Sequence, residues 1–377
     1  MSSVASDVDN SSLILDGHKL EWHLDRIRAW ERGERIAPVT IDMGLTRACN
    51  YACRYCFAMF QENSGSKITR QVMDDFIDDC AEIGVRAISF AGDGENTLHP
   101  AFVSSVVRGG EHGISIALNT NGFTMSGRKV EEVLPYLTYV RINITAAEPE
   151  RYAQIMGAKA AWFYTVVDNT RQMVALKRKH NLGVTIGMQM VLVPDYRDQI
   201  IPLAKLARQL EVDYLVIKHC SDNETGAFNL NYDKYEELYD TIREAQSYST
   251  PQTLIVAKWS KIKEGNNARS YQRCYGPPFM VQISGTGLVA PCGQLFNDKF
   301  KRYHMGNICE QRFKEIVQSD EYWEVINHLA SKDFNAQRMC GPLCRPHYVN
   351  EALDKHKKGY LPLSEPVGPT PLHVNFL

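Results

Sequence analysis

Three cysteines with short, defined spacing stand near the N-terminal end of the chain: Cys49, Cys53 and Cys56. Three residues separate the first pair and two separate the second, and Tyr55 directly precedes the last cysteine. Clustered cysteines without a secretory signal indicate a metal site rather than a disulfide framework. Three thiolates are one fewer than the four that usually hold an iron–sulfur cluster, so one iron would stay open to another ligand.

Zinc is the alternative metal for these thiols. Zinc sites usually combine a Cys-x2-Cys pair with a second pair close by. No second pair follows Cys56 for more than a hundred residues. The spacing therefore favours an open iron–sulfur cluster.

The pattern Cys-x3-Cys-x-aromatic-Cys, with Tyr55 in the aromatic place, resembles the signature of the radical SAM superfamily. The resemblance implies that Cys49, Cys53 and Cys56 hold a [4Fe-4S] cluster whose fourth iron binds S-adenosylmethionine (SAM). It also implies an electron donor such as a flavodoxin or ferredoxin, and cleavage of the cofactor to a 5′-deoxyadenosyl radical. Tyr55 is then expected beside the cofactor.

Composition places few restrictions beyond this. The 377 residues are 44% hydrophobic and 23% charged, as in ordinary globular proteins, which suits two or three domains. A formal net charge of -2 gives no electrostatic footprint for nucleic acid or an anionic membrane. Met1 to Asp9 is polar, and neither a signal peptide nor an apolar stretch long enough to span a membrane is visible in the sequence. Ten cysteines in such a chain predict reduced thiols in the cytoplasm.

Strand and helix patterns alternate from Thr40 to Gln246, after an amphipathic segment at Asp16 to Arg35. Expected strands cover residues 40–45, 85–90, 114–118, 139–144, 184–193 and 214–217. Expected helices cover 67–83, 102–112, 130–136, 161–180, 200–210 and 232–246. Such alternation predicts an α/β fold with a parallel sheet. It resembles the partial (β/α)6 TIM-like barrel of radical SAM enzymes.

Three domains are expected from this reading: an N-terminal tail and helix at 1–38, the barrel at 39–248, and a C-terminal region at 249–377. The alternation is expected to stop after Tyr248. In barrels of this kind the chemistry lies at the C-terminal ends of the strands. Each predicted strand end is therefore a place to look for site residues.

The second strand is followed by Gly92-Asp93-Gly94-Glu95, which resembles the Gly-Gly-Glu-Pro element of the family. That resemblance implies that Gly92, Gly94 and Glu95 contact the methionyl ammonium of SAM. Asn96 stands where proline is usual, so a different turn is expected. A plain glycine turn is the alternative.

Later strand ends carry further polar residues. Asn121 belongs to a Thr-Asn-Gly element that matches the family at the third strand. Asn143 stands where relatives often have a serine near the cofactor ribose, and Gln189 lies on the fifth strand. All three are expected to bind the cofactor, and for Gln189 a satisfied interior amide is the alternative.

The sixth strand ends in Lys218-His219-Cys220. A lysine and a thiol at a barrel mouth are candidate catalytic residues that face the substrate. A surface lysine and a buried, inert thiol are the alternatives.

Cysteines return in the last third as Cys274, Cys292, Cys340 and Cys344, around an expected hairpin at 279–290 and a following amphipathic helix. This order resembles the SPASM/twitch extension of radical SAM enzymes. The resemblance implies that these four thiolates hold one auxiliary [4Fe-4S] cluster, with zinc as the alternative. Cys309 falls outside the pattern. The apolar residues at 373–377 are expected to dock onto the body of the protein.

Three functions fit these features. The first is hydrogen abstraction from a small polar metabolite (a sugar, aminocyclitol or nucleoside-like compound), leading to oxidation or epimerisation. The second is modification of a ribosomal peptide. About 38 residues precede the barrel, too few for the peptide-recognition domain that many such enzymes carry, and this favours a small-molecule substrate. The third is a non-catalytic protein that binds iron–sulfur clusters or SAM.

Overall fold

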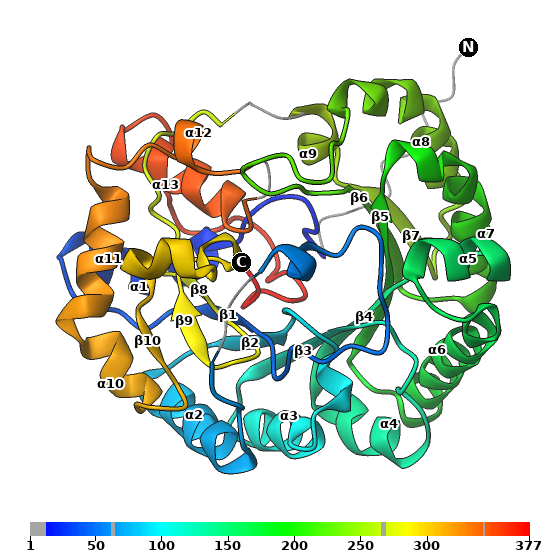
Figure 1. The fold of residues 1–377 in the computed structure, drawn as a ribbon, viewed down its shortest axis with the longest axis horizontal. Coiled ribbons are helices and arrows are strands. Elements are labelled where there is room, and N and C mark those ends of the chain that lie inside the picture. Colours follow the sequence, from blue (N-terminus) through cyan, green and yellow to red (C-terminus); the bar gives the residue numbers. More distant parts are fainter. Residues whose placement is uncertain (1–12, 62–64, 265–268, 342–343) are drawn as a thin grey trace.

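The computed structural model describes residues 13–61, 65–264, 269–341 and 344–377 (Figure 1). The predicted polar tail at Met1 to Asp9 lies outside these ranges. Within them, no helix is both long and apolar enough to cross a membrane.

A single ten-stranded sheet, in the order β10-β9-β8-β1-β2-β3-β4-β5-β6-β7, forms the centre of the molecule. The neighbours from β8 through β1 to β7 are parallel, and β8, β9 and β10 pair antiparallel. The seven strands of the barrel are β1 (Thr40–Met43), β2 (Ala87–Phe90), β3 (Ser115–Thr120), β4 (Leu137–Asn143), β5 (Thr185–Leu192), β6 (Tyr214–His219) and β7 (Leu254–Ala257). Because β7 and β10 are the two edges, the sheet is an open, partial barrel, as predicted.

Helices surround the outside of this sheet (Figure 1). They are α2 (Arg70–Ile83), α3 (Phe102–Glu111), α4 (Gly127–Val133), α5 (Pro149–Met156), α6 (Ala160–His180), α7 (Ile200–Leu210) and α8 (Tyr239–Gln246). The helix α2 shows how sequence sets their ends. The Thr69 hydroxyl accepts a hydrogen bond from Val72 N (3.2 Å), and Gly84 ends the helix with a left-handed φ of 79°. All eight residues of β5 are buried, as expected for a strand covered on both faces.

One expectation about element order is wrong, and one helix was missed. The alternation does not stop at Tyr248, because β7 pairs with β6 and is followed by α9 (Trp259–Glu264). The helix α5 between β4 and α6 was also not predicted. Each of these elements has only four to eight residues, too few for a periodic pattern to be recognised.

The C-terminal region extends the barrel sheet instead of forming a separate layer. Its hairpin strands are β8 (Met280–Ile283) and β9 (Leu288–Ala290), as predicted, and β8 pairs with β1. The remaining elements are β10 (Gly306–Asn307), α10 (Phe313–Gln318), α11 (Asp320–Ala330), α12 (Ala336–Met339) and α13 (His347–Lys357), and α1 (Leu24–Glu31) precedes the barrel.

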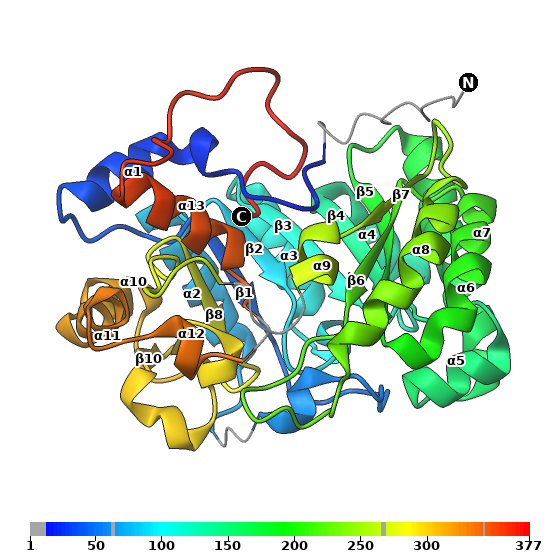
Figure 2. The same ribbon diagram turned by 90° about the horizontal axis from the view of Figure 1, so that it is seen from above.

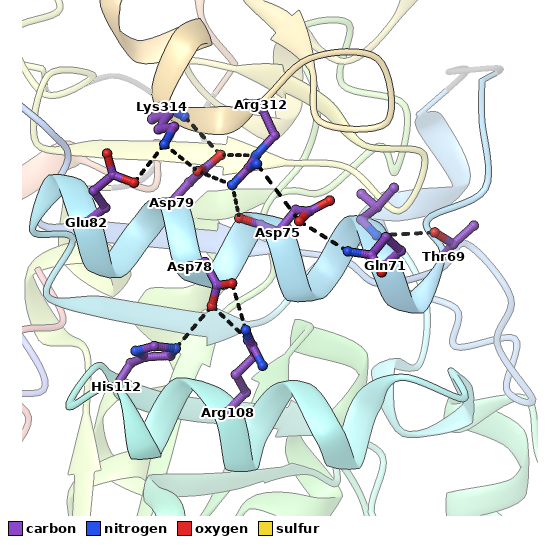
Figure 3. A network of polar contacts seen from close by, with 11 residues as sticks. Thr69, Gln71, Asp75, Asp78, Asp79, Glu82, Arg108, His112, Arg312 and Lys314 are labelled. Atoms are coloured by element: carbon purple, nitrogen blue, oxygen red, sulfur yellow. Dashed lines mark hydrogen bonds and ion pairs between the residues drawn. The ribbon is translucent and has the colours of Figure 1, made fainter.

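A network of charged side chains attaches this region to α2 (Figure 3). The Arg312 guanidinium binds the buried carboxylate of Asp79 through Nη2 (2.6 Å) and Nε (3.0 Å). Lys314 binds Glu82 at 2.7 Å, and Phe313 packs against Phe76 with ring centroids 5.0 Å apart. On the other side of α2, Arg108 and His112 of the α3 region bind Asp78. The contacts of Arg312, Phe313 and Lys314 hold the C-terminal region against the barrel, and those of Asp78 join α2 to α3.

The last five residues close the end of the barrel at which the strands begin. Asn375 O accepts a hydrogen bond from Thr40 Oγ1 (2.6 Å), and its Nδ2 donates to Ser115 Oγ (3.0 Å). Phe376 is 4% exposed and packs on Tyr139. The chain end lies in the middle of the ring of strands in Figure 1, and Figure 2 shows this segment on the same side of the barrel as α1. The expected docking of residues 373–377 is confirmed.

Candidate functional site

The cysteine loop, defined here as residues 44–61, starts at the C-terminal end of β1 and ends with a short 3-10 helix at Phe57–Phe60. Cys49 is exposed, and Cys53 and Cys56 are half-buried. Burial and then the neighbouring Cys56 and Cys49 thiols raise the pKa of Cys53. The structure therefore brings the three thiols into one neighbourhood, and sulfur donors are the ligands of iron–sulfur clusters.

Contacts with α5 and the glycine that follows it hold the cysteine loop in place. The Tyr51 hydroxyl lies 2.7 Å from the Tyr152 hydroxyl, and Ala52 N donates to Gly157 O (3.3 Å). A Cβ atom at Gly157 would lie 2.2 Å from Ala52 O, so only glycine permits this approach. The signal for α5 was present in the sequence as a proline at its first turn and a glycine after its last residue.

The loop after β2 packs directly on the cysteine loop. A Cβ atom at Gly92 would lie 2.6 Å from Gly44 N, and one at Gly94 would lie 2.1 Å from Thr46 O. Asn96, which replaces the usual proline, accepts a hydrogen bond from Leu45 N at its Oδ1 (2.7 Å). The departure at Asn96 thus gives an additional tie between these two loops.

Glu95 is 3% exposed, and its carboxylate accepts hydrogen bonds from nearby groups of the chain. Oε1 accepts hydrogen bonds from Thr97 N (3.2 Å) and from the hydroxyls of Thr97 (2.6 Å) and Thr120 (2.7 Å). Oε2 accepts one from Asn121 N (2.8 Å). This carboxylate therefore fixes the ends of β2 and β3 relative to each other, and Oε2 has further acceptor capacity for a ligand.

Three other predicted site residues are also linked by hydrogen bonds. Asn121 Nδ2 donates to Asn50 Oδ1 in the cysteine loop (2.8 Å). Asn143 and Gln189 stand opposite each other in the β4–β5 register, and Gln189 Nε2 donates to Asn143 Oδ1 (2.5 Å). Asn143 and Gln189 therefore form one pair on adjacent strands.

Tyr55 connects the cysteine loop to the end of β4. Its hydroxyl accepts a hydrogen bond from Thr145 Oγ1 (3.0 Å) and donates to Met156 Sδ (3.0 Å). Thr145 Oγ1 also accepts from Val191 N (3.2 Å). Burial raises the pKa of Tyr55 well above its usual value, and Cys53, Cys56 and Cys220 add to this effect.

Lys218 and Cys220 lie at the end of β6. Cys220 is 1% exposed, its Sγ donates to Ser221 O (3.7 Å), and burial raises its pKa to about 12. The thiol is therefore protonated at neutral pH, and it is one of the groups that raise the pKa of Tyr55 in the cysteine loop. Burial, and then the positive charges of Lys261, Arg141 and Arg345, lower the pKa of Lys218 to about 7.

The second thiol group brings together residues that are up to 70 positions apart: Cys274, Cys292, Cys340 and Cys344. The pKa of Cys274 is well above its usual value. Burial is the main cause, and the other three thiols also raise it. Pro342 and Leu343, between the last two cysteines, lie outside the described residues. Four thiols of this kind match the ligand set of a complete iron–sulfur cluster.

Side chains not predicted from the sequence surround this second group. The Tyr271 hydroxyl donates to Cys344 Sγ (3.3 Å), and Asn350 Nδ2 donates to Cys274 Sγ (3.6 Å) and Cys344 Sγ (3.8 Å). Arg269 Nη1 donates to Cys340 O (3.1 Å). Hydrogen bonds to the sulfurs adjust the potential of a bound cluster. No spacing rule in the sequence identifies these donors, because they come from segments on either side of the cysteines.

Asp93 joins the two ends of the site. Its Oδ1 accepts a hydrogen bond from Gly285 N in the β8–β9 turn (2.7 Å), and its Oδ2 lies 3.5 Å from Arg47 Nε in the cysteine loop. Cys309 is half-buried, and its thiol donates to Thr286 O (3.8 Å) in the same turn. Within the described residues, no three His, Cys, Asp or Glu side chains are already close enough to hold one metal ion.

Family comparisons agree with this arrangement. Residues 43–242 match the model of the radical SAM superfamily, and residues 274–345 match that of an iron–sulfur cluster-binding domain called SPASM. The first match covers more than half of the 377 residues.

Individual relatives are distant. A SAM-dependent nucleotide dehydratase of Lacinutrix mariniflava is 22% identical, with 66% of this chain and 54% of that protein covered. The chain thus spans about half the length of this relative. The mycofactocin maturase MftC of Mycolicibacterium smegmatis is 28% identical, with 80% and 75% covered. The crystal structure of Streptococcus suis SuiB bound to SAM superposes with a TM-score of 0.61 at 14% identity, covering 81% of this chain and 72% of that one.

Proposed function

Because the chain belongs to the radical SAM superfamily, we propose that it is an enzyme that abstracts a hydrogen atom from a small polar metabolite. Membership implies a SAM-binding [4Fe-4S] cluster, and the SPASM region implies auxiliary iron–sulfur binding. When bound, these cofactors supply the radical and the electron transfer. We propose a flavodoxin or ferredoxin as the electron donor, and the reducing cytoplasm suits both clusters.

The proposed ligands are the two thiol groups described above. Cys49, Cys53 and Cys56 hold the cluster that binds SAM, and Cys274, Cys292, Cys340 and Cys344 hold one auxiliary cluster. Around SAM, the chain offers backbone groups of the Gly92–Gly94 loop, the Glu95 carboxylate, the Asn121 side chain, the Tyr55 ring and the Asn143–Gln189 pair. Glu95 orients the ends of β2 and β3 through its four hydrogen bonds in addition to any contact with the cofactor.

The observation that carries the small-molecule proposal is the polar interior of the barrel at the end that the cysteine loop covers. Asn143, Gln189, Lys218 and Cys220 come from three neighbouring strands and are all buried or half-buried. A small polar compound can satisfy such groups inside the barrel. The nucleotide dehydratase relative acts on a small molecule by its name, whereas SuiB has been crystallised with a precursor peptide. Modification of a peptide is therefore the alternative.

The outcome for the substrate radical is oxidation or epimerisation. Four auxiliary thiols would fill every ligand position of a four-iron cluster, which leaves electron transfer as its use and favours oxidation. The protonated thiol of Cys220 offers the other outcome, because an S–H group can return a hydrogen atom to the opposite face of the substrate.

The experiment is an anaerobic assay of the reconstituted protein with SAM and a chemical reductant. Formation of 5′-deoxyadenosine by the wild-type chain, and its loss in the triple variant Cys49→Ala, Cys53→Ala, Cys56→Ala, is the expected result. Variant Cys309→Ala serves as the control, because its half-buried thiol lies outside both proposed ligand sets. Equal product from the triple variant would disprove the assignment of these three ligands. No product from the wild type would favour a non-catalytic protein.

A further inference from the structure

Three basic side chains come from the part of the barrel between β4 and β7. Arg141 lies on β4, Lys218 on β6, and Lys258 directly after β7. Arg141 stacks over the rings of Tyr139 (5.0 Å) and Tyr214 (5.5 Å), and its Nε donates to the Tyr214 hydroxyl (3.1 Å). All three cations are half-buried.

Further cations reach the same region from outside the strands: Lys19, Lys261 and Arg345. These six residues, from β4, β6, the β7–α9 segment, the N-terminal segment and the C-terminal region, are called the cationic cluster below. Five of the six line a cavity of about 60 Å³, and Lys218 is the exception. His373 and Phe376 of the C-terminal segment also line it. At about 10–15 Å³ per water, the cavity has room for roughly four to six waters, so it is large enough to take a small polar group.

Two carboxylates lie in this region: Asp42, and Asp16, whose Oδ1 accepts a hydrogen bond from the hydroxyl of the cavity-lining Tyr348 (2.5 Å). Asp42 binds Arg345, with Nε 2.5 Å from Oδ2, and Lys19 donates to Phe376 O (2.7 Å). Among the described residues, no carboxylate lies within ion-pair distance of Arg141, Lys218 or Lys258. Buried cations without counter-charges are unfavourable, because desolvation and like-charge repulsion add together. Burial, followed by nearby cations, accordingly lowers the pKa of Lys258 well below its usual value.

One structural explanation is that these cations balance the charge of the auxiliary thiolates. Lys261 Nζ does donate to Cys344 O (3.4 Å). However, the cation that acts on the pKa of Cys340 is Arg269, which is not part of the cationic cluster. Arg141 and Lys218 belong to barrel strands instead, and Lys218 is two residues from Cys220 at the proposed substrate site.

We propose that the cationic cluster binds a phosphate ester or polyphosphate group of the substrate, and this inference rests on the proposed function. At least three cations without an anionic partner match a group with two or more negative charges, and guanidinium and ammonium groups are the usual ligands of phosphate. With its phosphate in the cavity on Arg141 and Lys258, the rest of the molecule extends past Lys218 toward Cys220. The substrate class is thus a phosphorylated small metabolite.

The first test uses inorganic tripolyphosphate as the probe and calorimetry on the anaerobic wild-type holoprotein. We expect one tripolyphosphate per chain, binding that weakens as salt is added, and much weaker binding of citrate and acetate. At pH 8 we expect the protein to take up protons when the probe binds. This uptake is measured from how the binding enthalpy changes with the ionisation enthalpy of the buffer. Lys218, whose pKa is about 7, is mostly neutral at pH 8, and a bound anion raises its pKa. No binding, or binding without proton uptake, would overturn the proposal. Equal or tighter binding of citrate would overturn the phosphate assignment.

The second test compares variants. The double variant Lys218→Met, Lys258→Met should bind tripolyphosphate at least tenfold more weakly, and the control Lys234→Met, an exposed lysine on the short helix Tyr232–Leu238, should bind as the wild type does. Iron content and thermal unfolding show whether each variant is folded. If the double variant does not retain iron, the single variant Lys258→Gln replaces it. Unchanged affinity in a folded variant would disprove the site.

These measurements do not depend on radical chemistry. Tripolyphosphate binding without 5′-deoxyadenosine formation would reject the proposed function and keep the anion site. Formation of 5′-deoxyadenosine by a wild-type protein that does not bind the probe would reject the anion site alone.

Discussion

Arg345, the residue directly after Cys344, donates two hydrogen bonds to Asp42 on β1, with Nε 2.5 Å from Oδ2 and Nη2 3.3 Å from Oδ1. The pair joins the segment that carries the last auxiliary cysteine to the interior of the barrel. Asp42 is 3% exposed, and its negative charge raises the pKa of Arg345. The contact therefore connects the two proposed cluster sites through charged side chains, in addition to the core packing that the two regions share.

Replacing Arg345 with Met should destabilise the protein, because Asp42 would remain buried without a charged partner and with only the long hydrogen bond from Gln282 Nε2 (3.4 Å). Breaking a fully buried pair costs about 3–5 kcal/mol. Since the Arg345 side chain keeps 34% exposure, we expect about 2–3 kcal/mol. Thermal unfolding of the holoprotein measures the effect. The control Arg128→Met removes a surface pair with Glu132 and should change stability by less than about 0.5 kcal/mol. Equal effects in both variants would contradict this account of the pair.

The auxiliary thiols should bind iron independently of the cysteine loop. In the triple variant of Cys49, Cys53 and Cys56, we expect about four irons per chain after anaerobic reconstitution, because a [4Fe-4S] cluster takes four thiolates. Metal analysis and visible absorption measure the content. Zinc, or no metal, in this variant would refute an auxiliary cluster on Cys274, Cys292, Cys340 and Cys344.

Cys220 decides between the two outcomes for the substrate radical. Oxidation predicts a product two hydrogens lighter than the substrate, unchanged in the variant Cys220→Ala, when the reaction is run in heavy water. Mass spectrometry of the product is the measurement, and Cys309→Ala is the matched control. An isomer with one solvent deuterium from the wild type, and none from Cys220→Ala, would show that oxidation is wrong and that this thiol donates the hydrogen atom.

His373 should make the protein less stable as the pH falls below about 6.5. Burial, and then the charges of Arg141 and Lys19, lower the pKa of His373 to about 3, and its Nε2 lies 2.6 Å from Thr185 Oγ1. Between pH 6.5 and 3 the unfolded chain binds a proton at this residue and the folded chain does not, so stability decreases on acidification.

From pH 7.5 to 6.0 the loss due to this one residue is about 0.8 kcal/mol, or roughly 1–2 °C in the unfolding midpoint. Thermal unfolding at the two pH values is the measurement. The variant His373→Gln should lose this part of the pH dependence, whereas the exposed His180→Gln should keep it. A pH dependence that is the same in His373→Gln and in the wild type would disprove the assignment.

Local sequence was enough to predict several features. The spacing of Cys49, Cys53 and Cys56 is set within eight residues, so the loop that contains them could be identified before any fold was known. The barrel strands up to β6 and the β8–β9 hairpin were also predicted, because each has a periodic pattern or turn signal of its own. The α2 helix, with its Thr69 cap and Gly84 terminator, is the clearest example.

Only the tertiary structure decided which distant residues meet. The four-residue strand β7 has too short a pattern to recognise, yet pairing with β6 places Lys258 beside Lys218. Asp42 and Arg345 are 303 residues apart, and nothing in the sequence near either one specifies the other. Lysines and arginines on an unfolded chain are solvated, and their positions in the sequence do not show that they will meet. They become an anion-binding candidate only when parallel strands direct them into one interior, where burial and mutual repulsion make an opposite charge favourable.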